Sequence, residues 1–327
     1  MANQPAQTIW HNGRLKPWAE ATVHVMAHGL HYGSAVFEGI RVYETPDGPM
    51  GFRLTDHVQR LMDSARIYRM PETFSFEQIM AACHEVVVAN GFSSAYLRPI
   101  LYRGWGSLGV VPGESVPVEA AVAAIEWGAY LGKEGLEKGV DVCISSWNRP
   151  APNTTPAAAK ASGNYLSSQL ISGEARRNGY AEGIGLTVNG ELSEGAGENL
   201  FVVRDGVLYT PPQSCSILAG ITRHSILTMA QDLDIPVREQ NLSREALYLA
   251  DELFFTGTAA EVTPIASVDG IAVRCGGRGD MTRALQERFF GLFSGATEDR
   301  HRWLEPIRSK EPVQRQEKAH GIAAIAV

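Results

Sequence analysis

The sequence predicts an α+β protein (mixed α/β) built from two domains. Its 327 residues suffice for about two domains with separate cores. Alternating residues in Ala95–Arg103 predict a strand, and apolar residues at helical spacing after Thr55 predict a helix. The glycine-bounded stretch Gly128–Gly135 is typical of a hinge. The expected parts are a small N-terminal domain (1–127), an interdomain loop (128–136), a larger C-terminal domain (137–305) and an extension (306–327).

Composition and charge narrow the class of partner. The chain is 44% hydrophobic and 20% charged, which is ordinary for a globular protein. Its net charge of -7 argues against nucleic acid as the main partner. No secretory signal and no apolar run of membrane-spanning length is recognisable. Four scattered cysteines without a CxxC pair fit free thiols, so we expect a cytoplasmic protein without a structural metal.

The first half shows clear element boundaries. Asn12-Gly13 marks a hairpin turn after a short strand. Thr55 is a good N-cap for the first long helix. Ser75 and Gln78 have the spacing of a capping box for a second helix, which is expected to end near Asn90-Gly91.

The strand Ala95–Arg103 carries a polar face. Its period of two places Tyr96 and Arg98 side by side, which suits a carboxylate held in an apolar pocket. Pro99 predicts either an edge position or an irregularity in the ladder, since proline cannot donate a backbone hydrogen bond.

Two short motifs suggest functions that their context disfavours. The run Gly104–Gly109 matches GxGxxG, but a dinucleotide site needs a helix to begin there. Pro112 and Pro117 prevent that helix, so a glycine-rich loop is expected. His28 and His31 could suggest a metal, yet no third ligand is nearby, and packed or hydrogen-bonded histidines fit better.

The second half alternates hairpins and helices. Asn189-Gly190 and Asp205-Gly206 each predict a tight hairpin turn. Gly220-Ile221-Thr222 precedes an amphipathic helix, and free backbone amides at such a helix start could hold a phosphate. Such helix starts are common, so this signal alone is weak.

Lys160 is the residue on which a catalytic interpretation depends. It lies among Ala157, Ala158, Ala159 and Ala161, small residues against which a flat ligand could pack. Partial desolvation there would disfavour the ammonium form, and a neutral amine is what Schiff-base chemistry requires. The competing interpretation is an exposed lysine at the start of an alanine-rich helix.

The segment SEGAGENLF, Ser193–Phe201, follows Lys160 and places two glutamates among small residues. Together these segments resemble the fold-type IV aminotransferases, which use pyridoxal phosphate, and among them the branched-chain amino-acid aminotransferases. The resemblance extends from about Ile9 to Leu304 and includes VHVMAHGLHYGSAVFEGIR, RLTDHVQRL, AYLRP, WGAYLG, GITR and GTAAEVTP. It implies a mixed, pseudo-barrel sheet in the larger domain and a cofactor at the domain interface.

The resemblance also implies roles for individual residues. Lys160 would bind the cofactor covalently, Glu194 would pair with its pyridine nitrogen, and Tyr165 would bond its phenolic oxygen. Groups that would hold its phosphate are Arg60, Ile221, Thr222 and Thr258.

The implied substrates are leucine, isoleucine, valine and the pair 2-oxoglutarate and glutamate, in a ping-pong reaction. Arg98 would meet the side-chain carboxylate of glutamate, while Tyr96, Thr258 and Ala259 would bind the α-carboxylate. Apolar walls would come from Phe37, Trp127, Tyr130 and Tyr165, with Tyr32 and Val110 of a second subunit. A homodimer at least is therefore implied, with a hexamer as a further possibility.

Other activities remain open at this point. D-amino-acid aminotransferases, (R)-amine transaminases and aminodeoxychorismate lyases share this fold. The combination of Phe37, Tyr96 and Arg98 favours the branched-chain interpretation, although Leu108 stands where methionine is common. A dinucleotide-dependent oxidoreductase is disfavoured by the missing helix, and a non-catalytic protein by the presence of Lys160 and Glu194.

Overall fold

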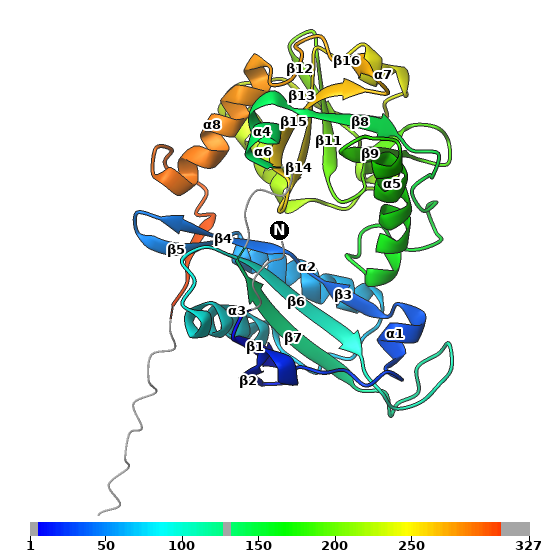
Figure 1. Cartoon of the computed structure of the whole chain (residues 1–327), viewed down its shortest axis with the longest axis vertical. Coiled ribbons are helices and arrows are strands. Elements are labelled where there is room, and N and C mark those ends of the chain that lie inside the picture. The colour runs from blue at the N-terminus through cyan, green and yellow to red at the C-terminus, as the bar shows by residue number, and fades with distance from the viewer. Residues whose placement is uncertain (1–5, 127–131, 309–327) are drawn as a thin grey trace, which may run out of the picture.

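The chain forms two stacked halves, each organised around one β-sheet (Figure 1). The structure, a computed structural model, describes residues 6–126 and 132–308. In Figure 1 the N-terminal half lies below and the C-terminal half above. The α+β fold expected from the sequence is confirmed, since helices and a mixed sheet occur together.

The lower half contains a sheet of eight strands within the described residues, in the order β17-β5-β4-β6-β7-β1-β2, with β3 paired to β6. Its pairings are antiparallel. The strands are β1 (Thr8–His11), β2 (Arg14–Pro17), β3 (Ala35–Phe37), β4 (Ile40–Thr45), β5 (Gly48–Phe52), β6 (Ala95–Arg103), β7 (Val118–Ile125) and β17 (Leu304–Pro306).

Helices α2 (Leu54–Ile67) and α3 (Phe76–Asn90) cover one face of this sheet, and the short α1 (His28–Tyr32) lies at its end. Val58 and Leu61 of α2 are fully buried in the core beneath them, together with Val86 of α3. The capping box of Ser75 and Gln78 is present, and Gly91 ends α3 in the left-handed conformation.

The predicted N-cap of α2 is wrong. The helix begins at Leu54, and Arg53 occupies the cap position with a φ of 53°. Thr55 instead donates its hydroxyl to Glu305 at 2.6 Å, so its polar group serves a contact 250 residues away in sequence. A local pattern could not reveal that partner.

Pro99 lies in a central strand, so the irregularity expected there is present and the edge position is not. β6 pairs with β7 along one side and with β3 and β4 along the other. Pro99 faces the break between β3 and β4, where its carbonyl accepts a hydrogen bond from Glu38 N at 2.9 Å. The missing amide of proline therefore costs no ladder bond.

The upper half contains a curled, mixed sheet of nine strands within the described part of the chain. Their order is β10-β9-β8-β15-β14-β11-β12-β13, with β16 paired to β15. The strands are β8 (Val140–Ile144), β9 (Glu182–Leu186), β10 (Leu192–Gly195), β11 (Asn199–Arg204), β12 (Val207–Thr210), β13 (Val237–Glu239), β14 (Glu252–Gly257), β15 (Glu261–Val268) and β16 (Ile271–Ala272).

Among the described residues, five α-helices flank this sheet: α4 (Gly132–Lys138), α5 (Tyr165–Arg177), α6 (Ile221–Asp232), α7 (Glu245–Tyr248) and α8 (Asp280–Ser294). Short 3-10 turns occupy Trp18–Glu20, Ser162–Asn164 and Gln213–Cys215. Both predicted hairpins are present, and Asp205 and Gly206 adopt φ values of 50° and 75°. This pair of positive φ angles matches the twist of the flanking strands.

The chain passes between the halves twice. It first crosses between β7 and β8, where α4 already occupies part of the expected 128–136 loop. It returns after α8, when β17 pairs with β5 in the lower sheet. The proposed domain limits remain a prediction. Among the residues the structure describes, no helix is long and apolar enough to cross a membrane.

Candidate functional site

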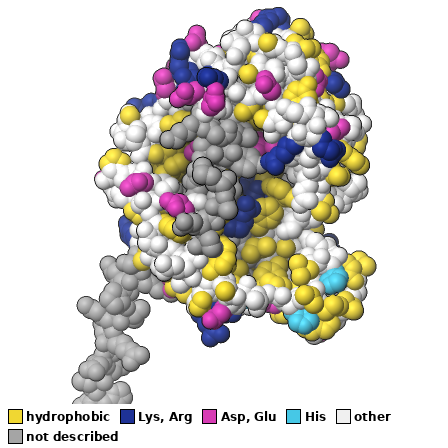
Figure 2. All heavy atoms as spheres, in the orientation of Figure 1, with side chains coloured by type: hydrophobic (Ala, Val, Ile, Leu, Met, Phe, Trp, Pro, Cys, Tyr) yellow, Lys and Arg dark blue, Asp and Glu magenta, His cyan; other side chains and the backbone are white. Residues whose placement is uncertain are grey.

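A polar cavity of about 730 Å³, open solvent at its mouth included, lies between the two halves. Figure 2 shows this hollow, where Lys or Arg side chains lie beside hydrophobic ones. Nine of the residues to which the resemblance gives a role line the cavity, although they come from six separate segments of the chain. They are Arg60, Tyr96, Lys160, Tyr165, Glu194, Ile221, Thr222, Thr258 and Ala259.

Lys160 lies in an irregular segment before the 3-10 turn Ser162–Asn164 that leads into α5, so the helix-start interpretation is wrong. Its amine donates to the hydroxyl of Tyr165 at 2.5 Å. The nitrogen lies 5.2 Å from the centre of the Phe37 ring, which in turn contacts Tyr165 at 4.8 Å between ring centroids. An amine, a phenol and an aromatic face therefore meet at one point of the cavity wall.

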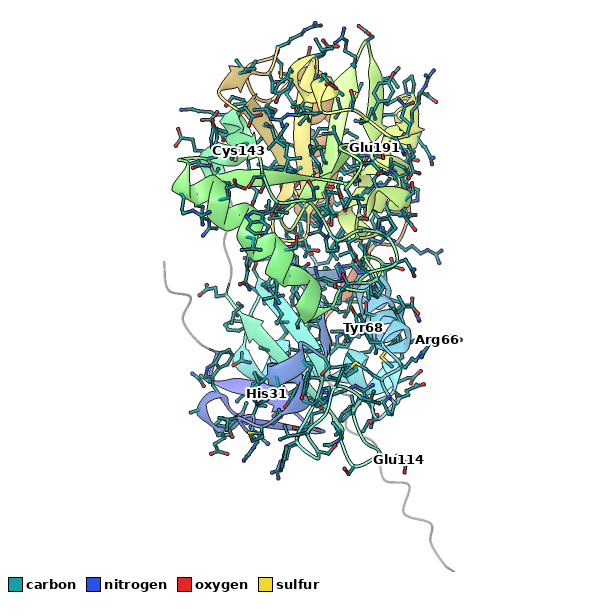
Figure 3. All side chains as sticks on the ribbon, turned by 90° about the vertical axis from the view of Figure 1, so that its right-hand side faces the viewer. His31, Arg66, Tyr68, Glu114, Cys143 and Glu191 are labelled. Atoms are coloured by element: carbon teal, nitrogen blue, oxygen red, sulfur yellow. The ribbon has the colours of Figure 1, made fainter. Side chains whose placement is uncertain are left out.

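The backbone around Lys160 is held by the lower half of the molecule. Its amide donates to Ser64 Oγ at 3.0 Å, and its carbonyl accepts from Phe37 N at 3.0 Å. Ala161 forms an isolated bridge with Val36. The hydroxyl of Tyr68 also donates to Asn164 Oδ1 at 3.4 Å, just below the start of α5 (Figure 3). The lower half thus holds the backbone at Lys160, while Tyr165 of the upper half holds its amine.

Glu194 is buried, and three donors hold its carboxylate. Arg149 Nη2 lies 2.6 Å from Oε1, while Asn199 Nδ2 and Leu218 N bond Oε2 at 2.9 and 3.1 Å. Burial raises the pKa of Glu194, and the Arg149 guanidinium and the Leu218 amide oppose that rise. With a cation at 2.6 Å, the ionised form is the one the geometry stabilises at neutral pH.

Arg60 of α2 lines the cavity, and the buried carboxylate of Glu38 holds its guanidinium. Glu38 accepts two hydrogen bonds from it, at 2.6 and 2.9 Å, and one from His57 Nδ1 at 2.7 Å. Burial alone would raise the pKa of Glu38, but Arg60 and His57 together hold it well below its usual range. Arg60 Nη1 also donates to Ala219 O at 2.8 Å. This leaves about two of the five guanidinium donors for a ligand.

The start of α6 faces the same end of the cavity. The amides of Ile221 and Thr222 belong to the first turn, where no helical partner exists for them. Opposite, Thr256 Oγ1 is fully buried and bonds no protein atom of the described chain. Amides at a helix N-terminus, a guanidinium and a free hydroxyl form a donor set suited to an anion.

A second polar group occupies the other wall. A Cβ at position 39 would lie 1.8 Å from Tyr96 Oη, so only glycine leaves room for this hydroxyl. The Arg98 guanidinium lies over Phe37 at 4.8 Å and over Tyr96 at 5.2 Å. The face predicted from strand periodicity therefore points Tyr96 and Arg98 toward the entrance.

Comparison with known proteins identifies the family. Residues 35–268 match the family model described as amino-transferase class IV. The chain belongs to the class IV aminotransferases.

Individual members of the class IV aminotransferases match over almost the whole chain. A branched-chain-amino-acid aminotransferase of Salmonella typhimurium is 56% identical, covering 94% of this chain and all of that protein. The crystal structure of the Escherichia coli branched-chain amino acid aminotransferase superposes with a TM-score of 0.91 at 56% identity, covering 93% of this chain and 100% of that one. The Thermobaculum terrenum enzyme, solved in its PLP form, gives a TM-score of 0.87 at 35% identity, covering 94% and 100%.

Some of the predicted class IV site residues do not line this cavity. Phe37 and Arg98 lie beside the cavity: Phe37 contacts Tyr165, which lines it, and Arg98 lies over the Phe37 ring. Tyr32 and Val110 are 43% and 80% exposed and do not line the cavity of their own chain. Trp127 and Tyr130 fall outside the described residues. His28 is buried and hydrogen bonded to Ser34 Oγ and Gly109 O, as the alternative to a metal ligand predicted.

Three functional positions went unnoticed in the sequence. Arg149 fixes Glu194, Glu38 fixes Arg60, and Arg41 holds the loop after β14 by donating to Thr258 O and Ala259 O at 3.3 and 3.4 Å. Glu38 lies next to Phe37 and Arg149 lies in SSWNRP, but their partners are 22 and 45 residues away. No local spacing links residues that far apart.

Proposed function

We propose that the chain catalyses pyridoxal phosphate-dependent transamination between branched-chain L-amino acids and 2-oxoglutarate. The observation that carries this proposal is the cluster of half-buried Lys160 and Tyr165 with buried Glu194 in one cavity, where Arg149 pairs with Glu194. The relatives at 56% identity bear the name of this activity. Leucine, isoleucine and valine would be the donors, and the two half-reactions would follow ping-pong kinetics.

The donor set fits the cofactor. The phosphate would lie among Arg60, the amides of Ile221 and Thr222, Thr258 and the otherwise unbonded hydroxyl of Thr256. The pyridine nitrogen would face Glu194, and the phenolic oxygen would face Tyr165. When bound, the cofactor supplies an electron sink for the substrate's α-carbon.

Three side chains of the cavity would then carry out proton transfer and stabilise charge: Lys160, Tyr165 and Glu194. Lys160 Nζ takes the proton from the substrate's α-carbon, because it is the basic group that shares the cavity with Tyr165. The hydroxyl of Tyr165 orients that amine. Glu194 stays ionised through Arg149 and would stabilise a positive charge on the pyridine nitrogen of the bound cofactor.

The entrance combines apolar and cationic surface. Phe37 and Tyr165 offer aromatic walls for a branched aliphatic side chain. Arg98, beside Phe37, would bind the second carboxylate of 2-oxoglutarate or glutamate. Tyr96, together with Thr258 and Ala259, would receive the α-carboxylate shared by all substrates.

Assembly and location complete the proposal. Tyr32 and Val110 are exposed and would complete the cavity of a second subunit, so we propose a homodimer at least. Trp127 and Tyr130 would add apolar walls to the cavity of their own chain. A hexamer is compatible with the same pairing. Four thiols without disulfides favour a reducing compartment, so we propose the cytoplasm.

The visible spectrum of the purified holoenzyme tests the function. Adding L-leucine should bleach the absorption band of the bound cofactor, and adding 2-oxoglutarate should restore it. A band that ignores L-leucine but responds to D-alanine or an (R)-amine would reject the branched-chain assignment. Absence of any band after incubation with pyridoxal phosphate would reject the cofactor.

A further inference from the structure

Glu198 occupies a position that the proposed function leaves unexplained. It lines the main cavity and also a second, open groove between α5, the start of β9 and the connection from β10 to β11. The two hollows share Tyr165, Ser168, Ala196, Gly197 and Glu198. The groove reaches Arg176 on α5 and Glu182 on β9. Glu198 therefore separates the lysine end of the cavity from a second opening.

The surroundings of Glu198 differ from those of Glu194, four residues earlier. Glu194 has the Arg149 guanidinium at 2.6 Å. Glu198 is only 5% exposed, accepts a hydrogen bond from Gly197 N at 3.0 Å and forms no ion pair with any described residue. Glu182, 1% exposed, is a second buried acid in the same groove, where Gly183 N and Ser172 Oγ donate to it. One carboxyl of the site is paired with a cation and the other faces another acid.

Burial without a cation favours the neutral acid. The charged groups around Glu198 are Glu182 on β9, Glu194 on β10 and Lys160 before α5, with Arg176 acting on Glu182. Burial and then Glu182 raise the pKa of Glu198 to about 8, with Glu194 adding to the rise. Gly197 N and Lys160 oppose it but are outweighed. Two neighbouring carboxyls with opposite environments have different protonation states, which is how acid and base roles are assigned.

We infer that Glu198 serves the reaction as a neutral acid, which exchanges its proton with solvent through the groove beneath α5. This inference rests on the proposed transamination and deepens it. A second carboxylate at this wall would repel Glu194 and would favour the ammonium form of Lys160. The neutral acid leaves the amine free to accept the α-proton. Glu198 acts through Lys160 and is therefore a positioning residue.

The first test needs neither cofactor nor activity. A folded-state pKa above the unfolded value means that stability is fully present at acidic pH and is lost as the pH rises toward the folded pKa. For the apoenzyme, we expect the unfolding constant of wild type relative to Glu198→Gln to rise by up to about tenfold per pH unit between about pH 5 and 8. A ratio that does not change with pH would overturn the inference.

The second test uses the holoenzyme. Wild-type kcat with L-leucine should decline as the pH rises through about 8, because Glu198 ionises there. Glu198→Gln should lack that decline, whatever its activity at neutral pH. Glu182→Gln removes a negative charge near Glu198, so the decline of kcat in this variant should occur at lower pH than in wild type. The control Glu287→Gln changes an exposed glutamate of α8, and its kcat should have the same pH dependence as that of wild type.

The outcomes separate the two proposals. If wild type fails to transaminate L-leucine while the apoenzyme ratio changes with pH, the proposed function falls and the protonated Glu198 stands without a role in this reaction. If transamination is present but Glu198→Gln and wild type have parallel pH profiles, the inference falls alone. If Glu198→Gln does not fold, an unchanged pH midpoint of kcat in Glu182→Gln overturns the inference, because the loss of the Glu182 charge should lower the pH at which Glu198 ionises.

Discussion

The two ends of the cavity are built in different ways. At the phosphate end, Arg60 comes from the lower half, whereas Ile221 and Thr222 come from the upper half. At the ring end, Lys160, Tyr165 and Glu194 all belong to the upper half, and so does Arg149. Binding at the first end therefore depends on how the halves meet, while charge at the second is set locally. Variants at the phosphate end should therefore change cofactor binding, and variants at the ring end should change the rate of the chemical step.

Lys160→Ala should have the largest effect, at the ring end. Removing the general base is expected to lower kcat by roughly 10⁴-fold or more, while pyridoxal phosphate remains bound through the other end. Stopped-flow turnover and equilibrium dialysis would measure the two quantities. Lys138→Ala removes an exposed lysine that pairs with Glu134, so it should behave as wild type. Substantial turnover in Lys160→Ala would contradict the assigned base.

Glu38→Gln should damage the phosphate end without touching the ring end. Removing one partner of a buried pair costs about 3–5 kcal/mol of folding stability, and Arg60 would lose its orientation. Because the folded pKa of Glu38 is depressed, its contribution is present at neutral pH and is lost as the pH falls below its usual value. Thermal unfolding and cofactor titration would measure both effects.

The matched control for that experiment is Glu298→Gln, which breaks an exposed pair with Arg300. Exposed pairs contribute at most about 1 kcal/mol, so little change is expected. Weaker cofactor binding in Glu38→Gln with kcat unchanged at saturating cofactor would support the separation of the two ends. A fall in kcat with unchanged binding would oppose it.

Arg149→Met should alter chemistry with a smaller effect on binding. Arg149 lowers the pKa of Glu194 against the influence of burial, so its loss should raise that pKa further. Glu194 would then become neutral at a higher pH, and the acidic limb of the kcat profile should move upward. Its kcat at neutral pH is expected to fall about 10–100-fold, as for loss of an orienting partner. An unmoved acidic limb would show that Glu194 does not need Arg149.

Arg98→Ala should have the narrowest effect, because it should weaken the reaction of one substrate only. Losing a charged hydrogen bond costs about 1.5–3 kcal/mol, so kcat/KM for 2-oxoglutarate should fall roughly 10–150-fold. The value for 4-methyl-2-oxopentanoate, which has no second carboxylate, should change little. Arg238→Ala, which removes an exposed arginine of β13 far from these roles, is the control. Equal losses for both oxo acids would refute the carboxylate role.

Sequence reasoning succeeded where a local rule decides the structure. The turn at Asp205-Gly206 needs two positive φ angles, and the capping box joins Ser75 to Gln78 within the first turn of one helix, so both were predictable. Thr55 satisfied the same kind of rule but bonds Glu305 instead. Glu38 and Arg149 escaped notice because their importance exists only once distant segments meet.

The return of β17 to the lower sheet has a consequence for how the molecule could be divided. Arg53 N donates to Trp303 O at 2.7 Å and β17 pairs with β5, so the lower half is assembled from two separate stretches of chain. A protease that cuts the connection between β7 and β8 would leave the upper half carrying β17 as its own anchor. The two fragments would share one sheet, which makes this enzyme a candidate for splitting and reassembly from co-expressed pieces.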